Sequence, residues 1–161
     1  MTLPRCGLYR TTAPIGEIPE GRLVFFHNHG DPGPGIYLPE SWHLNRARFA
    51  ASGTSLLDER LAANLAPVPP EGLYRVEEQI TCCPQACRTF VAGQLVQVGY
   101  NARAEPILFQ PAWTAAGLTF PTVGQILDPE RLAHLSLLHV ADGDRSPPSE
   151  PEPHRPPGLL H

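Results

Sequence analysis

The sequence has few charges and no long apolar run. Charged residues make up 17% of the 161 residues, and the net charge of −4 carries no basic excess, so we expect no binding to nucleic acid. The longest purely apolar run, residues 23–26, is far shorter than the roughly 20 residues that span a bilayer, so we expect no membrane segment. The first residues lack the charged-then-apolar pattern of a signal peptide, which favours a cytoplasmic protein.

Cysteine is also scarce, with four residues, whereas proline is abundant, with 20 residues beside 14 glycines. Prolines crowd residues 142–161, which contain only two large apolar side chains and are predicted to form a disordered C-terminal tail. Residues 148–151 and 153–156 match the loose PxxP pattern that polyproline-binding domains recognise, but a solubilising tail is the simpler interpretation. The prolines before the tail favour short strands and turns over long helices.

The remainder of the sequence is an internal repeat. The tetrapeptide Gly-Leu-Tyr-Arg occurs at residues 7–10 and again at 72–75, and Gly-x-Leu-Val occurs at 21–24 and at 93–96. From residue 36 onward the register holds without a gap at an offset of 71, so that Trp42 corresponds to Trp113 and residues 59–62 correspond to 130–133. Because each copy must be able to form the same supersecondary unit, the sequence predicts a first half at residues 1–68 and a second half at 71–141.

Each half is predicted to contain three strands and a short closing helix. The strands are expected at residues 7–11, 22–27 and 35–38, and at 73–80, 94–100 and 106–109. Helical spacing after Trp42 conflicts with the glycine and proline after Trp113, so we expect an irregular strand or at most one helical turn there. Asp128 followed by Pro129 and Glu130 is typical of a helix start, and Asp58 is its counterpart.

This order of elements resembles that of small SH3-type barrels. The sequence thus predicts a mainly β protein of two packed, SH3-like open barrels, joined by a proline-rich connector at residues 66–70. Each half is near the lower size limit for an independent core, so we expect the halves to pack together. A fold-level resemblance of this kind predicts no function.

The first candidate for chemistry is the array His27, His29 and Asp31. On an extended backbone these alternate side chains point the same way and would converge on one ion. The corresponding residues of the second half are Gly99, Asn101 and Arg103, so the array is confined to the first half. The alternative interpretation is a strand end whose histidines form hydrogen bonds with the turn that follows.

The second candidate is a thiol-rich segment, Cys82, Cys83 and Cys87, in the part of the second half that has no counterpart in the first. Three thiols with Cys6 or a histidine as fourth ligand would form a zinc site, although the spacing is not a usual zinc pair. Reduced thiols that pack as small hydrophobic groups are the default in a cytoplasmic protein, and disulfides are less favoured still.

The third candidate is the region after the paired tryptophans. Both Trp42 and Trp113 are predicted to be largely buried, because they persist while their neighbours differ. His43, Arg46 and Arg48 occur only in the first half, where they would form a solvated face or bind an acidic partner.

The sequence contains no phosphate loop and no nucleophile–base motif. A non-enzymatic adaptor that binds another protein is therefore favoured, with no cofactor and an oligomeric state that the sequence does not indicate. One alternative is a metal-dependent hydrolase or oxygenase that uses zinc or another divalent metal at His27, His29 and Asp31. A further alternative is a zinc-structured or thiol-redox protein centred on Cys82, Cys83 and Cys87.

Overall fold

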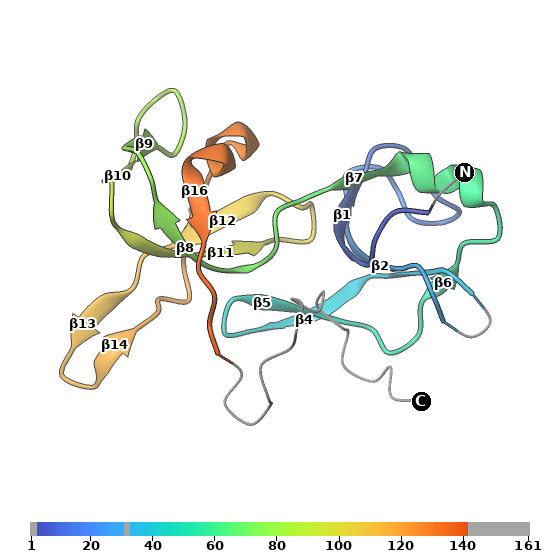
Figure 1. The fold of residues 1–161 in the computed structure, drawn as a ribbon, viewed down its shortest axis with the longest axis horizontal. Coiled ribbons are helices and arrows are strands. Elements are labelled where there is room, and N and C mark those ends of the chain that lie inside the picture. Colours follow the sequence, from blue (N-terminus) through green and yellow to red (C-terminus); the bar gives the residue numbers. More distant parts are fainter. Residues whose placement is uncertain (1–2, 31–32, 142–161) are drawn as a thin grey trace.

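The computed structural model describes residues 3–30 and 33–141 (Figure 1). These residues form sixteen short strands and two 3₁₀ helices, which confirms the prediction of a mainly β protein. Asp31 and the predicted disordered tail at residues 142–161 lie outside the described residues. No helix among the described residues is long and apolar enough to cross a membrane.

The first half contains an antiparallel sheet of five strands in the order β6-β3-β2-β1-β7. Its strands are β1 (Gly7–Thr11), β2 (Leu23–His27), β3 (Gly35–Tyr37), β6 (Thr54–Ser55) and β7 (Leu65–Pro67). A separate hairpin of β4 (Pro39–His43) and β5 (Arg46–Phe49) follows β3, and the 3₁₀ helix η1 (Glu59–Asn64) precedes β7.

The second half contains a five-stranded antiparallel sheet in the order β15-β12-β11-β8-β16. These strands are β8 (Gly72–Val76), β11 (Leu95–Tyr100), β12 (Pro106–Phe109), β15 (Gln125–Ile126) and β16 (Leu135–Leu137). The hairpin of β13 (Ala112–Thr114) and β14 (Gly117–Thr119) follows β12, and η2 (Pro129–His134) precedes β16. The part of the second half that has no counterpart in the first lies in the region of β9 (Ile80–Thr81), β10 (Thr89–Phe90) and the loop between them.

The two sheets share one order of corresponding strands, with the strand before each 3₁₀ helix at one edge and the strand after it at the other. The repeated tyrosine has the same role in each: Tyr9 donates to the carbonyl of Arg5 at 2.8 Å, and Tyr74 donates to that of Pro70 at 2.6 Å. Neither sheet closes into a barrel within the described residues, since each has two edge strands that pair on one side only.

The short helices predicted after Asp58 and Asp128 are present, and both are 3₁₀ helices rather than α-helices. The Asp58 carboxylate accepts the backbone N–H of Arg60, as an N-cap residue does, whereas the Asp128 side chain makes no such bond. Each helix is six residues long and leads directly into an edge strand of its sheet.

Strand β2 is buried along its whole length because it contributes to two cores. Val24 and Phe26 lie in a cluster made by the first half alone. Leu23 and Phe25, which alternate with them, belong to a larger cluster that continues into the second half through Tyr74. This larger cluster packs the two sheets against each other.

The segment after Trp42 forms the turn and second strand of a hairpin, in place of the predicted irregular strand or helical turn, and the register of this hairpin shifts once, between Pro39 and Ser41. Leu44 and Asn45 have φ values of 50° and 63°, so they form the two-residue turn with left-handed backbone that suits hairpins. The apolar spacing after Trp42 suggested a helix, but it arises from two short strands that place Trp42 opposite Ala47.

Candidate functional sites

The pairing of β1 with β2 brings a cysteine to the histidine array. Gly7 lies opposite Phe26 in the ladder, so Cys6, just before β1, is adjacent to His27 at the end of β2. Cys6, like a histidine, was one candidate for the fourth ligand of the thiol cluster in the second half, but it groups with His27 and His29 instead. The antiparallel register is the signal that would have found this pairing.

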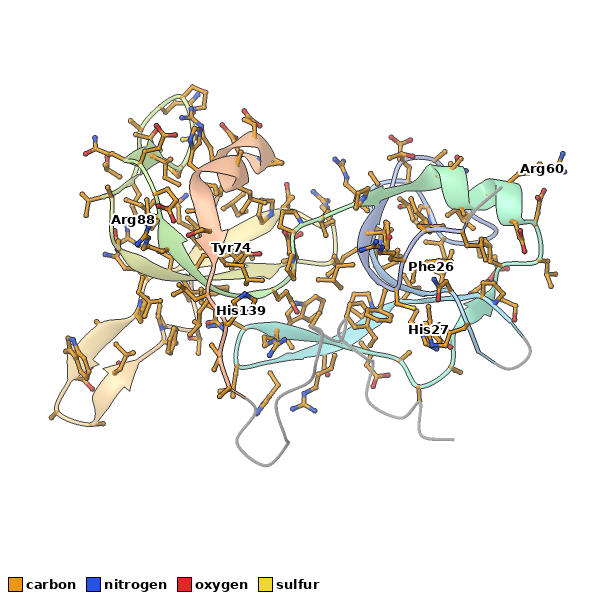
Figure 2. The ribbon with its side chains drawn as sticks, in the orientation of Figure 1. Phe26, His27, Arg60, Tyr74, Arg88 and His139 are labelled. Carbon is orange, nitrogen blue, oxygen red and sulfur yellow. The ribbon has the colours of Figure 1, made fainter. Side chains whose placement is uncertain are left out.

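The three side chains present their donor atoms to a common point. The Cys6 Sγ lies 3.3 Å from the His27 Nδ1 and 3.6 Å from the His29 Nδ1, and all three ligand atoms lie within 4.8 Å of one another. The centroids of the two imidazole rings are 4.2 Å apart, although His29 lies in a bend after β2 and not on the extended strand that the sequence predicted. His27, which is labelled in Figure 2, is buried, whereas Cys6 is partly exposed and His29 is exposed, so solvent has access to the group.

Asn28 holds this group in place. Its backbone N–H donates to the Cys6 Sγ at 3.3 Å, and its side-chain amide donates to the carbonyl of Pro4 at 3.0 Å. The Asn28 Oδ1 accepts a hydrogen bond from the Cys6 thiol at 3.1 Å and lies 2.6 Å from the His29 Nδ1, from which it accepts when that nitrogen is protonated. Asp31, the third member of the predicted array, lies outside the described residues.

The thiol-rich segment forms a second cluster on the inserted loop. The Cys83 Sγ lies 3.5 Å from the Cys82 Sγ and 3.7 Å from the Cys87 Sγ, and all three cysteines are free thiols. Cys82 is buried in the core, whereas Cys87 is exposed. The backbone N–H of Cys87 and the Cys82 thiol donate to Cys83 and lower its thiol pKa, while the pKa of Cys87 is raised by its hydrogen bond and charge interaction with Cys83.

A third site is the interface that the hairpin β4–β5 makes with the second half, toward which it extends (Figure 1). The Trp42 indole N–H donates to the carbonyl of Tyr100 at 2.7 Å. The Asn45 amide donates to the Gln97 Oε1 at 2.9 Å, and the Gln97 amide donates to the carbonyl of Leu44 at 2.8 Å. The backbone passes so close to Gly99 that an added Cβ would lie 2.4 Å from the Asn45 carbonyl oxygen. The hairpin therefore docks on β11 through specific polar contacts.

Glu71, the residue just before β8, also holds this hairpin in place. Its carboxylate accepts the backbone N–H of Ala47, at 3.0 Å and 3.2 Å from the two oxygens, and that of Tyr100. Burial raises the pKa of Glu71 to about 7, and these hydrogen bonds and the charge of Arg46 only partly oppose that effect. Glu71 occupies the position that corresponds to Cys6 in the first half.

The residues predicted to bind a partner are on this hairpin. Arg46 acts on Glu71 of its own chain, so at least part of its charge is used within the molecule. His43 and Arg48 are exposed side chains of β4 and β5. None of the three is shown to bind a partner.

The prediction that both tryptophans are largely buried is wrong, although they do occupy corresponding positions in the two hairpins. The exposed fraction is 43% for Trp42 and 82% for Trp113. Trp42 lies against β11, but the hairpin β13–β14 projects away from both sheets (Figure 1). Trp113 pairs with Leu118 as Trp42 pairs with Ala47, so the two hairpins share this cross-strand pairing. Their turns and surroundings differ, since positive φ occurs at Leu44 and Asn45 in the first hairpin and at Gly117 in the second.

The segment around Trp113 is neutral and apolar. Residues 106–127 contain no Asp, Glu, Lys, Arg or His. Its exposed large apolar side chains are Trp113, Leu118, Phe120, Val123 and Ile126. Five exposed large apolar side chains within one uncharged segment make it a candidate interaction site.

Comparisons with known proteins found no matching family model, curated protein or solved structure.

Proposed function

We propose that the chain is a non-enzymatic adaptor that binds another protein through the hairpin β13–β14. The observation that carries this proposal is Trp113, an indole with an exposed fraction of 82% on a hairpin built like one that docks on a sheet. Tryptophan is enriched among the residues that dominate binding energy at protein interfaces, because it buries a large area and donates one hydrogen bond.

The hairpin β4–β5 supports a protein as the ligand of β13–β14. Trp42 satisfies its indole N–H on a backbone carbonyl at the end of a strand, and its hairpin partner Ala47 donates to a carboxylate. A partner that offers Trp113 the end of a β-strand with small side chains would reproduce this geometry. The neutrality of residues 106–127 favours an apolar acceptor surface over an acidic or basic one.

A second copy of this chain does not provide that acceptor. Its β11 is already covered by its own hairpin β4–β5. On β2, Phe25 and His27 occupy the positions of Gln97 and Gly99, and Phe25 is buried. These two observations favour a different protein as the acceptor.

The proposal also covers the scaffold that carries the two hairpins. Each half is taken as a variant of the SH3-type open barrel, which the order of five antiparallel strands in each sheet supports. The halves would be a tandem duplication in a cytoplasmic protein, in which the first hairpin stabilises the scaffold and the second binds the partner.

The proposal is tested by placing a photo-crosslinking residue at Ala115, in the turn of β13–β14, in the cells that produce the protein. The crosslinked partner is identified, purified and titrated with the chain by calorimetry. Trp113→Ala is expected to weaken binding by about 30-fold or more, the effect of removing a residue that dominates an interface. Val91→Ala, which truncates an exposed apolar side chain next to β10, is the matched control and should bind like the wild type.

Two results would overturn this function. The first is concentration-dependent self-association that Trp113→Ala abolishes, because the occupant would then be a second copy. The second is Trp113-dependent binding to neutral phosphatidylcholine vesicles, because the hairpin would then bind a lipid surface.

A further inference from the structure

We propose that Cys6, His27 and His29 form a zinc site with three protein ligands, a site separate from the hairpin that binds the partner. The three residues come from the start of β1 and the end of β2, which the β ladder holds next to each other. Sulfur and two imidazole nitrogens are a donor set that zinc prefers.

The distances between the donor atoms match those of a tetrahedral zinc ion. A Zn–S bond of about 2.3 Å and a Zn–N bond of about 2.05 Å, at the tetrahedral angle, place sulfur and nitrogen about 3.6 Å apart. The Cys6 Sγ lies 3.3 Å from the His27 Nδ1 and 3.6 Å from the His29 Nδ1. One ion can therefore contact both Nδ1 atoms and the sulfur with only small side-chain adjustments.

The backbone holds the Cys6 sulfur at this site. The backbone N–H of Asn28 donates to the Cys6 Sγ and fixes its position next to the two histidines. In the second half the backbone N–H of Tyr100 donates in the same way to the Glu71 carboxylate. Both halves thus place an acidic group at this position, and in the first half that group is a metal ligand beside two histidines.

Zinc binding would release protons from the ligand atoms. Without metal, the Asn28 Oδ1 accepts from the Cys6 thiol or the His29 Nδ1. When zinc binds, the thiol loses its proton to solvent, and any proton on either Nδ1 is lost or moves to Nε2. The partial exposure of Cys6 and the exposure of His29 leave the fourth coordination position open to water.

The site is tested in the full-length chain with Cys83→Ser and Cys87→Ser introduced together, which removes the competing thiol cluster and leaves only the buried Cys82 there. We expect this protein to bind one equivalent of Zn²⁺. With Co²⁺, it should show a thiolate-to-cobalt charge-transfer band and the intense d–d bands of tetrahedral cobalt. His29→Ala should weaken Zn²⁺ binding by more than about 100-fold, since the loss of an outer hydrogen-bond partner alone costs about 10- to 100-fold.

His29 is exposed, so its substitution should leave the fold intact, and circular dichroism checks this. His139→Ala removes another exposed histidine and serves as the matched control, with unchanged zinc affinity expected. Cys6→Ser should also abolish the charge-transfer band. The proposal is overturned if no equivalent of zinc binds, or if the bound zinc is unaffected by His29→Ala and Cys6→Ser, since the cluster would then be only a hydrogen-bonded group.

Discussion

Glu71 shows how one buried carboxyl group connects the two halves. It lies just before β8, it has an exposed fraction of 4%, and it accepts a backbone N–H from the hairpin of the first half. Its pKa of about 7 in the folded protein, against an ordinary value near 4.5, means that folding favours the protonated form. The unfolded chain loses this proton at lower pH than the folded chain does.

We therefore predict that stability falls as the pH rises from about 4.5 to 7. Below the unfolded pKa both states are protonated and the contribution of Glu71 is fully present; above the folded pKa it is lost. The shift from 4.5 to about 7 corresponds to a change on the order of 3 kcal/mol in the free energy of unfolding. Denaturant midpoints measured across this range should fall in the wild type and flatten in Glu71→Gln, whose amide oxygen still accepts the Ala47 N–H.

Glu20→Gln is the matched control, because Glu20 is an exposed carboxyl group, and its pH profile should follow the wild type. A Glu71→Gln profile as steep as that of the wild type would show that other groups cause the pH dependence.

At the scale of elements, the two hairpins share their strand pairing but differ in their turns and in their surroundings. Each pairs a tryptophan with an apolar residue across two short strands. The first hairpin carries Asn45, which bonds to Gln97 and to the carbonyl of Pro121 in the second half. The second hairpin has Ala116 at the corresponding position and lacks this amide.

We predict that the two tryptophans differ in their effect on stability. Trp42→Ala removes a half-buried ring and the hydrogen bond to the carbonyl of Tyr100, so it should lower the free energy of unfolding by about 2 to 4 kcal/mol. Trp113→Ala removes an exposed side chain and should change it by less than about 0.5 kcal/mol. Urea unfolding of the two variants measures both values, and equal losses would contradict the assignment of the first hairpin to the scaffold.

At the scale of the whole molecule, one core spans both halves. Leu8, Leu23, Phe25 and Phe49 of the first half share a cluster with buried residues of β8 and β11. A smaller cluster, which includes Val24 and Phe26, belongs to the first half alone. The first half therefore has a core of its own, but its sheet is covered on the other face only when the second half is present.

We predict that residues 1–68 do not fold cooperatively on their own. The fragment would expose these four large apolar side chains, each worth about 1.5 to 3 kcal/mol when buried, and this loss is comparable with the 5 to 15 kcal/mol that stabilises a typical domain. Thermal unfolding of the fragment, followed by circular dichroism, should show no sigmoidal transition. A transition that matches the full chain would mean that the smaller cluster is sufficient.

The sequence by itself determined the local elements of this protein. Strands at Gly7–Thr11 and Pro106–Phe109 agree with the predicted bounds, because short runs rich in apolar residues between turn formers favour an extended backbone irrespective of the rest of the fold. The short helices after Asp58 and Asp128 also followed from local signals, although only Asp58 forms the capping hydrogen bond. The sequence placed His27 and His29 on one side of the chain, but His29 lies in the bend that follows β2.

Tertiary structure alone decided which equivalent residues are covered and which distant residues meet. Trp42 and Trp113 occupy matching positions, yet only Trp42 lies against a sheet. The first hairpin contacts β11 of the second half, whereas the second hairpin projects away from both sheets (Figure 1). Cys6 joined the histidines rather than the other thiols because ladder register, and not cysteine spacing, places side chains together across strands. Burial and proximity are properties of pairs of segments, so a pattern repeated within one chain does not determine them.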